Sequence, residues 1–443
     1  MDKSLAIQIS SGSLLKYALP TILSNIFMNV YSLVDSLFVA NLISTDALSA
    51  VSIAGPFLAI ALAVGTMIAT GGSALVAKQL GEGNAQEARE NFSFFMIFCV
   101  FASLLFTFGG IAFREPLLHA MGSDAALYPL CEAYAIPLFI AIPFVMSAIL
   151  LQIFFVAAGA PGWAFALSLA GGVTNIALDY VLIAIVPWGV ASAAWASAAG
   201  YILQSVIGVC YFAFKRNGSL YLVRPKCNFS AFVKACGNGV SEMVGMLAGT
   251  ITLIAMNIIL MKIVGSDGVA AGAVVLAAQS ILSALYMGYA QGIAPIISFN
   301  YGGNNYENLK KLFKCALITV AGLSVLTFAL AYPAAKPLAL LYADGTEHVI
   351  EMSVKGIRVF APAFLLMGFN LFASSMFTAL NDGKTSGILA LFRTLIFLII
   401  PLLILPGILG VNGVWLSLPT AEILSVLMAI FYFRKMKSIY HYA

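Results

Sequence analysis

The chain has 443 residues, of which 62% are hydrophobic and only 9% are charged, and its mean hydropathy is +1.01. Its apolar runs repeatedly exceed the roughly 20 residues that a helix needs to cross a bilayer, so a soluble protein is excluded and a polytopic membrane protein is predicted. The net charge of +4 indicates no acidic partner, because lysines and arginines near a membrane are placed by topology.

Apolar runs between polar breaks predict twelve spans. The first six lie near residues 14–40, 48–76, 92–113, 128–156, 162–186 and 190–214. The other six lie near residues 232–261, 269–298, 314–335, 352–380, 385–408 and 411–433. We expect helices throughout, because strands would alternate in polarity and would leave unpaired backbone groups in lipid. The first run is about twice as long as a signal-peptide core and no cleavage site follows it, so we interpret it as a span.

Basic residues indicate the orientation of the chain. If both termini face the cytoplasm, 16 of the 22 lysines and arginines fall in inner segments and only five in outer ones. The positive-inside rule therefore predicts that both ends are cytoplasmic. The six cysteines and three histidines show neither metal-ligand nor disulfide spacing, and the histidines lie in loops or the tail, so we expect no intramembrane enzyme.

The chain is predicted to be internally duplicated. The only long polar inner segment between spans is KRNGSLYLVRPKCNFS, so we expect an N-terminal lobe at 1–214, a cytoplasmic linker at 215–231, a C-terminal lobe at 232–433 and a cytoplasmic tail at 434–443. Two motifs repeat across it with one offset of 221 residues, TDALSA against SDGVAA and LGEGN against YGGNN. Six spans return the chain to the same side, so the repeats are parallel and would face each other across a central cleft.

Few ionisable groups fall inside the spans. The acids that do so are Asp35, Asp179, Glu242 and Glu422. A buried intramembrane charge costs at least a few kcal/mol, so each should face a cavity or a partner. Helical periodicity and depth place Asp35, Asn175 and Asp179 on inward faces in the outer half of the first lobe. Tyr134 and Ser197 reach the same layer from spans 4 and 6. The two aspartates with the amide can bind a proton or a small hard cation, or they can merely link neighbouring helices by hydrogen bonds.

Two further features stand out inside the spans. Pro20 lies within span 1, where it removes a backbone hydrogen bond and favours a kink, either as a static bend or as a moving hinge. Arg393 and Glu422 both lie near mid-membrane, and we expect them to form a structural ion pair.

Together these residues resemble the multidrug and toxic compound extrusion (MATE) family of the MOP superfamily. The resemblance covers essentially the whole chain and is carried by KYALPTILSNIFMNVYSLVDSLFVANL, by LGEGN with its echo NYGGNNYE, and by GGVTNIALDYVLI. It implies an all-α, two-lobed antiporter with twelve transmembrane helices in the cell inner (plasma) membrane. Such a protein exports organic, often cationic, drugs or toxic compounds in exchange for protons or sodium ions by alternating access.

The resemblance also implies roles for individual residues. In bacterial members with an acidic site in the N-terminal lobe, the positions that bind the proton or sodium ion match Asp35, Asn175, Asp179, Tyr134 and Ser197. Pro20 matches the proline about which span 1 bends. Another branch uses acids in spans 7 and 10. Glu242 is a possible second-lobe acid here, but Asn370 stands where the span 10 acid is expected.

The resemblance implies no cofactor other than the coupling ion, H⁺ or Na⁺. The expected partners are small organic substrates and membrane lipid, with no nucleic acid, and the functional unit would be a monomer. The alternative is a lipid-linked oligosaccharide flippase of the same superfamily. A flippase should line its cleft with cations for a diphosphate, whereas the first lobe offers acids, so we favour a cationic or zwitterionic substrate.

Overall fold

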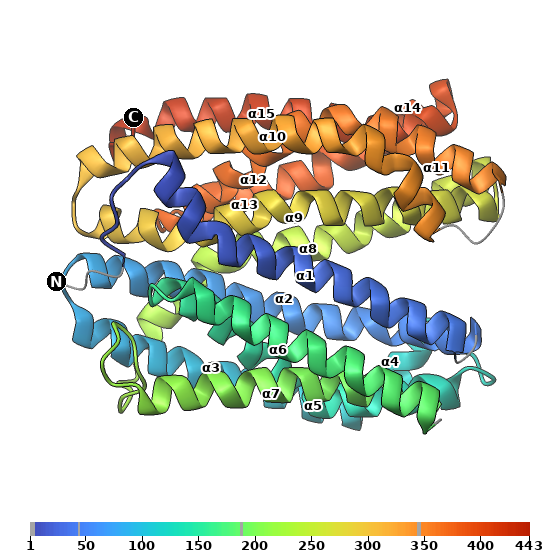
Figure 1. Ribbon diagram of the computed structural model, residues 1–443, viewed down its shortest axis with the longest axis horizontal. Coiled ribbons are helices and arrows are strands. Elements are labelled where there is room, and N and C mark those ends of the chain that lie inside the picture. Colours follow the sequence, from blue (N-terminus) through green and yellow to red (C-terminus); the bar gives the residue numbers. More distant parts are fainter. Residues whose placement is uncertain (1–4, 43–44, 187–188, 343–346) are drawn as a thin grey trace. The chain divides into compact units, whose positions relative to one another are not determined.

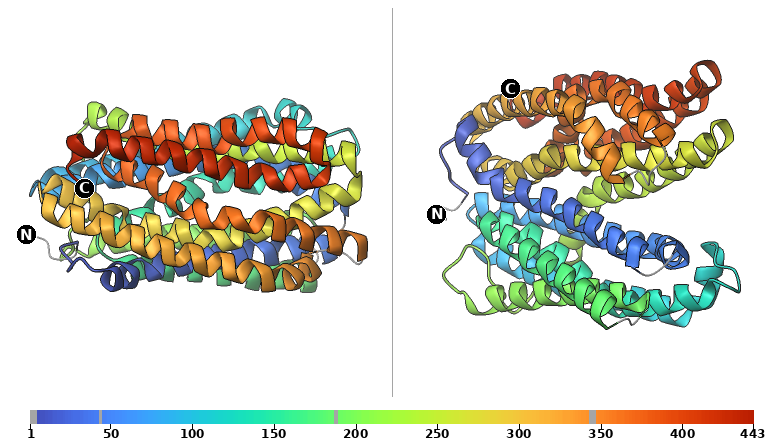
Figure 2. Two further views of the ribbon diagram at one scale, coloured as in Figure 1. Left: turned by 90° about the horizontal axis from the view of Figure 1, so that it is seen from above. Right: turned by 45° about the vertical axis from the view of Figure 1, so that its right-hand side comes forward.

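A computed structural model describes the backbone of residues 5–42, 45–186, 189–342 and 347–443, and the side chains of these ranges other than 33–42, 45–48, 184 and 342. Every regular element in these ranges is helical (Figures 1 and 2). Eleven helical segments are long and apolar enough to cross a membrane, and α1 (Ser11–Leu42) is a further helix of 32 residues. The prediction of an all-α polytopic membrane protein is confirmed.

The chain packs into two compact units, Leu23–Gly239 and Ile7–Ile22 with Val240–Ala443, which we call the first and the second unit. Two helices, α1 and α8 (Phe229–Ile263), pass from one unit to the other. The first unit also contains α2 (Thr45–Gly81), α3 (Ala85–Ala112), α4 (Arg114–Ala120), α5 (Tyr128–Ala157), α6 (Pro161–Asp179) and α7 (Ala191–Phe214). The second also contains α9 (Ser266–Gly302), α10 (Tyr306–Tyr342), α11 (Glu347–Phe360), α12 (Phe364–Ala379), α13 (Gly383–Leu391), α14 (Phe397–Leu409) and α15 (Val411–Tyr440).

Three of the predicted spans are interrupted rather than continuous. The span expected at 352–380 consists of α11 and α12, which a 3-10 turn, η2 (Ala361–Ala363), joins around a proline that has no N–H to donate. A π-helical turn, η1 (Tyr180–Ile185), continues α6, and another, η3 (Phe392–Ile396), lies between α13 and α14. Such turns are uncommon and occur frequently at functional sites.

The same turns recur at equivalent positions of the two units. Residues with a left-handed backbone in the first unit have counterparts 221 or 222 residues later in the second unit. These pairs are Gly83 with Asn304, Gly159 with Asn381, and Gly189 with Gly410. In the first two pairs, the next residue donates its N–H to the carbonyl five residues earlier, at 2.8 to 2.9 Å in all four turns. A left-handed backbone favours glycine and asparagine, which explains the residue types. The predicted internal duplication is therefore confirmed.

Each unit has its own tightly packed interior. In the first, Phe92 of α3, Phe155 of α5 and Phe212 of α7 are fully buried, and their rings meet with centroids 4.5 to 4.9 Å apart. In the second, Tyr286 of α9 and Trp415 of α15 are buried in one cluster. Because lipid tails are as apolar as these side chains, van der Waals packing rather than the hydrophobic effect holds the helices of each unit together.

The polar segment 215–228 between α7 and α8 packs against α3. Arg89 donates from Nε to the carbonyl of Ser219 at 3.0 Å, and the hydroxyl of Ser93 accepts the N–H of Val223 at 2.9 Å. Both contacts lie in the first unit. The bounds given above for two lobes, a linker and a tail stay a prediction.

Candidate functional site

A polar pocket of about 170 Å³ lies inside the first unit, among α1, α2, α5, α6 and α7. The residues that line it are Tyr31, Ser32, Leu58, Tyr134, Leu138, Gly171, Asn175, Ser197, Gly200, Tyr201 and Gln204. Most of them carry a hydroxyl or an amide, although the helices around them are strongly apolar. We call this space the first-unit pocket.

Two glycines allow α6 and α7 to approach closely at this pocket. A Cβ on Gly200 would lie 2.7 Å from the carbonyl oxygen of Gly171, and a Cβ on Gly171 would lie 1.8 Å from Nε2 of Gln204. Small residues at such an interface let the two backbones meet. Because the helices are so close, the Nδ2 of Asn175 on α6 can donate to the Oγ of Ser197 on α7, at 3.2 Å.

The amide of Asn175 is only half satisfied. Its side chain is 3% exposed, and its Oδ1 has no hydrogen-bond partner among the described residues. Leaving a buried acceptor unsatisfied costs about 1–3 kcal/mol, so this oxygen is suited to bind a ligand that enters the pocket. By contrast, the Nε2 of Gln152 donates both to Ser168 and to Gln204, at 2.9 Å each.

The two predicted aspartates are placed differently by the structure. Asp179 ends α6 one helical turn after Asn175, it is fully buried, and the π turn η1 follows it directly. Asp35 lies in α1, but its side chain is outside the described residues. Tyr31 and Ser32, four and three residues earlier in the same helix, line the pocket.

The structure thus brings three of the predicted site residues, Tyr134, Asn175 and Ser197, to one pocket. Asp179 is buried on the helix that supplies Asn175. Pro20 lies within α1, two residues before the point where this helix passes from the second unit to the first. The roles of these residues in ion binding stay predictions.

Some residues around the pocket were not predicted from the sequence. Tyr31 gave no signal, because a single aromatic residue in a span is most often a lipid or core contact. Gln152 did give one, as a lone amide in the apolar run of α5, and it holds Gln204 in place beside the pocket.

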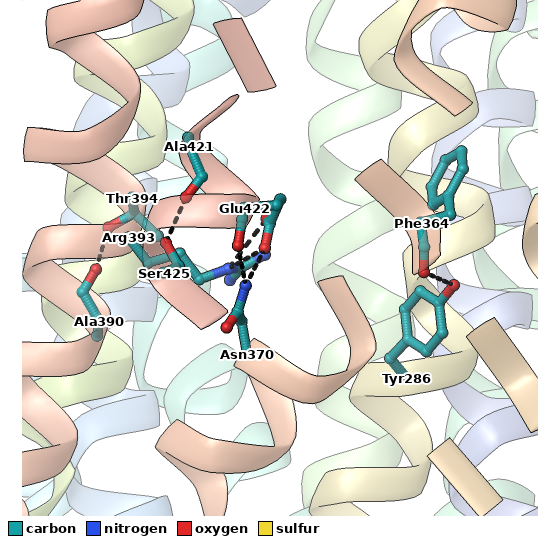
Figure 3. Close-up of polar contacts among 9 residues, drawn as sticks. All are labelled: Tyr286, Phe364, Asn370, Ala390, Arg393, Thr394, Ala421, Glu422 and Ser425. Carbon is teal, nitrogen blue, oxygen red and sulfur yellow. Dashed lines mark hydrogen bonds and ion pairs between the residues drawn. The ribbon is translucent and has the colours of Figure 1, made fainter. Parts of the chain in front are cut away.

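A second polar cluster lies in the second unit (Figure 3). The side chain of Glu422 on α15 is 1% exposed, and its carboxylate accepts from Nη2 of Arg393 at 2.8 Å and from Nε at 3.1 and 3.2 Å. Asn370 of α12 donates to the same carboxylate at 2.6 Å and to the Glu422 carbonyl at 3.0 Å. The predicted ion pair between Arg393 and Glu422 is confirmed. Glu242 of α8, the possible second-lobe acid, is half-buried.

The size of the first-unit pocket limits what it can bind. Pockets for drug-sized molecules typically measure about 300–1,000 Å³, so a space of about 170 Å³ suits an ion with a few waters rather than an organic substrate. Its amide and hydroxyl oxygens are the ligands that hard cations prefer. Among the described side chains, no group of three or more His, Cys, Asp or Glu is arranged to hold a metal ion.

Comparisons with known proteins agree with this fold. The family model MatE matches residues 20–181 and 243–403. The multidrug export protein MepA of Staphylococcus saprophyticus is 23% identical over 430 residues, which cover 94% of this chain and 92% of that protein. A crystal structure of MATE in complex with MaL6 superposes with a TM-score of 0.94 at 19% identity, over 100% of this chain and 99% of that one.

A second solved structure, the outward-facing conformation of a multidrug resistance MATE family transporter of the MOP superfamily, gives a TM-score of 0.92 at 20% identity and covers 99% of this chain and 98% of that one. Because the family model matches more than half of its length, the chain belongs to the MatE family. It is therefore a membrane-embedded transporter and not an enzyme.

Proposed function

We propose that this protein is a secondary active antiporter that exports organic, mainly cationic, compounds in exchange for protons or sodium ions by alternating access. The observation that carries the proposal is the first-unit pocket. There the Oδ1 of Asn175, which has no hydrogen-bond partner among the described side chains, lies in an ion-sized space one helical turn from the buried Asp179. Asp35, Asn175 and Asp179 would bind the ion, and Tyr134 and Ser197 would complete its surroundings.

The carboxylates explain why an ion is needed there. A charged carboxylate in the membrane interior is costly, and a proton or a sodium ion removes most of that cost. The protein would therefore favour different arrangements of the pocket in the loaded and the empty state. An ion can shift a conformational equilibrium only by its differential affinity for the two states, and a site that closes around the ion provides such a difference.

Helix α1 is the element that would transmit this change. Its residues Tyr31 and Ser32 line the pocket, whereas its first part, up to Ile22, packs in the second unit. Pro20 has no N–H to donate within the helix, so bending is easiest near this point. Ion binding would repack α1 around Pro20, and the two units would then exchange access between the two sides of the membrane.

The organic substrate would bind outside the first-unit pocket, which is too small for it. Its cationic character is supported by the acids within the spans of the first unit, and its being an organic compound by the multidrug export that the name of the relative MepA states. The excess of basic residues in the predicted inner loops supports a plasma-membrane protein with both termini in the cytoplasm. Glu242 is a candidate for a further acid of the second unit.

The test is transport by the purified protein in proteoliposomes, with a fluorescent organic cation as substrate. We expect the dye to move against its own gradient when a proton or a sodium gradient of opposite direction is imposed, and the two gradients are applied separately to identify the ion. Antiport would be contradicted if the dye moved as fast without any ion gradient as with one. It would also be contradicted if the dye moved with neither the proton gradient nor the sodium gradient.

A further inference from the structure

Three residues of the second unit form a polar cluster whose purpose the antiport mechanism does not explain. They are Asn370, Arg393 and Glu422, and we call them the second-unit cluster. Arg393 lies in the π turn η3, Glu422 pairs with it from α15, and Asn370 of α12 donates to the carboxylate of Glu422 (Figure 3). The backbone beside Arg393 is tied to α8, because the hydroxyl of Thr252 donates to the carbonyl of Thr394 at 3.0 Å.

The recurring turns show which positions of the first unit correspond to this cluster. The turn at Gly159 precedes α6 and its counterpart at Asn381 precedes α13, which makes Arg393 the equivalent of Gly171 at an offset of 222. The turn at Gly189 precedes α7 and its counterpart at Gly410 precedes α15. These two turns are 221 residues apart, which makes Glu422 the equivalent of Tyr201.

Both equivalent positions, Gly171 and Tyr201, line the first-unit pocket. The second unit therefore has a guanidinium where the first unit has a glycine beside the pocket. A Cβ at Gly171 would already collide with Gln204, so the first unit has no room for a longer side chain there. The same place in the repeated architecture holds a neutral amide from the neighbouring helix in one unit and a positively charged side chain in the other.

The groups around Arg393 are those of a cation site. The carboxylate of Glu422 is almost fully buried, and both of its oxygens accept from the guanidinium. Asn370 is 3% exposed, and its Oδ1 has no hydrogen-bond partner among the described residues. The buried carboxylate and this free amide oxygen are the kinds of ligand that would bind a small cation if the guanidinium were absent.

We propose that Arg393 is a tethered cation that permanently fills a monovalent-cation site formed by Glu422 and Asn370. A guanidinium fixed to the backbone cannot leave with the solute, so the second unit keeps its charge balanced without exchanging an ion. Its bidentate contact with the carboxylate also links α15 to η3 more rigidly than a free ion would. This inference concerns ion binding alone and does not depend on the transport that we propose above.

The test compares the number of sodium ions bound by the purified full-length protein and its variants, measured with radioactive sodium at mildly alkaline pH. Arg393→Ala should bind one more sodium ion per chain than the wild type. The double variant Arg393→Ala/Glu422→Gln should return to the wild-type number, because it lacks the carboxylate on which the site depends. Sodium binding in the first unit contributes equally to all three proteins, so its presence or absence leaves the difference unchanged.

Equal sodium binding by the folded Arg393→Ala variant and the wild type would overturn the proposal, as would an extra ion that persists in the double variant. If Arg393→Ala does not fold, Arg393→Met is used instead, because methionine keeps most of the side-chain volume. Its thermal unfolding is measured in sodium chloride and in choline chloride. Sodium chloride should raise its Tm relative to choline chloride, since a ligand that binds only the folded state stabilises it. That shift should vanish in Arg393→Met/Glu422→Gln, and no difference between the two salts in Arg393→Met would equally overturn the proposal.

Discussion

The close approach of α6 and α7 at the first-unit pocket makes Gly200→Ala a sharp perturbation of the site. The added Cβ would lie 2.7 Å from the carbonyl oxygen of Gly171, whereas ordinary contact begins at 3.4 Å, so the two helices must separate by roughly 0.7 Å. The hydrogen bond from Asn175 to Ser197 is already 3.2 Å long and would stretch beyond bonding distance.

The expected cost follows from these changes. Overpacking costs about 1–3 kcal/mol, the lost hydrogen bond about 0.5–1.5 kcal/mol, and the better helix propensity of alanine returns about 1 kcal/mol, which leaves a net destabilisation on the order of 2 kcal/mol. Thermal unfolding in detergent measures this loss, and dye efflux in proteoliposomes measures its effect on ion coupling, which we expect to fall as the pocket widens.

A matched control is Gly109→Ala in α3 of the same unit, where no atom of a neighbouring element in the described part of the chain lies within 4 Å of the added Cβ. This variant should be neutral or more stable by up to about 1 kcal/mol, with unchanged efflux. The reasoning is refuted if Gly200→Ala proves as stable and as active as Gly109→Ala.

Three further variants or conditions are informative. Ser197→Ala removes the acceptor for Nδ2 of Asn175, so it should lower stability by about 1 kcal/mol and weaken ion-driven efflux; wild-type efflux would separate this hydroxyl from the site. Tyr442 is fully buried in an aromatic cluster, and its hydroxyl donates to the carbonyl of Phe433 at 2.8 Å. Tyr442→Ala should therefore lower the free energy of unfolding by about 3–5 kcal/mol, whereas Tyr442→Phe should lower it by only about 1 kcal/mol. Equal losses in the two variants would contradict a mainly packing role for this ring. Burial, and then the carboxylate of Asp382, raise the pKa of Tyr442, so the stability that this neutral phenol contributes is present below about pH 10 and is lost as the pH rises towards the folded-state value. Tyr442→Phe should be less sensitive to alkaline pH than the wild type, and an unchanged alkaline loss would refute that origin.

Much of the fold is predictable from the sequence because its signals are periodic and local. Long apolar runs specify membrane-spanning helices, and LGEGN with its echo reveals the duplication because a left-handed turn needs glycine or asparagine at one position. The interruptions at η1 and η3 give no such signal. η1 lies in continuous apolar sequence, and the arginine and threonine of η3 are residue types that an uninterrupted α-helix also accepts.

The candidate site is predictable only in part. Helical periodicity selects Asn175 and Ser197 as inward-facing, but it cannot say that Gly171 and Gly200 meet across two helices and set the distance between them. The relation between Arg393 and Gly171 is hidden for another reason. The two residues share no chemistry, and only the turn geometry at Gly159 and Asn381 aligns the helices that carry them.

The central claim, that a carboxylate beside the first-unit pocket couples export to an ion gradient, is tested most directly by Asp179→Asn. Asparagine keeps the shape of the buried side chain but cannot become charged, so the protein should remain folded and lose gradient-driven dye efflux in proteoliposomes by at least about tenfold. The control is Asp267→Asn in the first turn of α9, outside the pocket, which should transport like the wild type. Gradient-driven efflux by Asp179→Asn that equals that of Asp267→Asn would contradict the account.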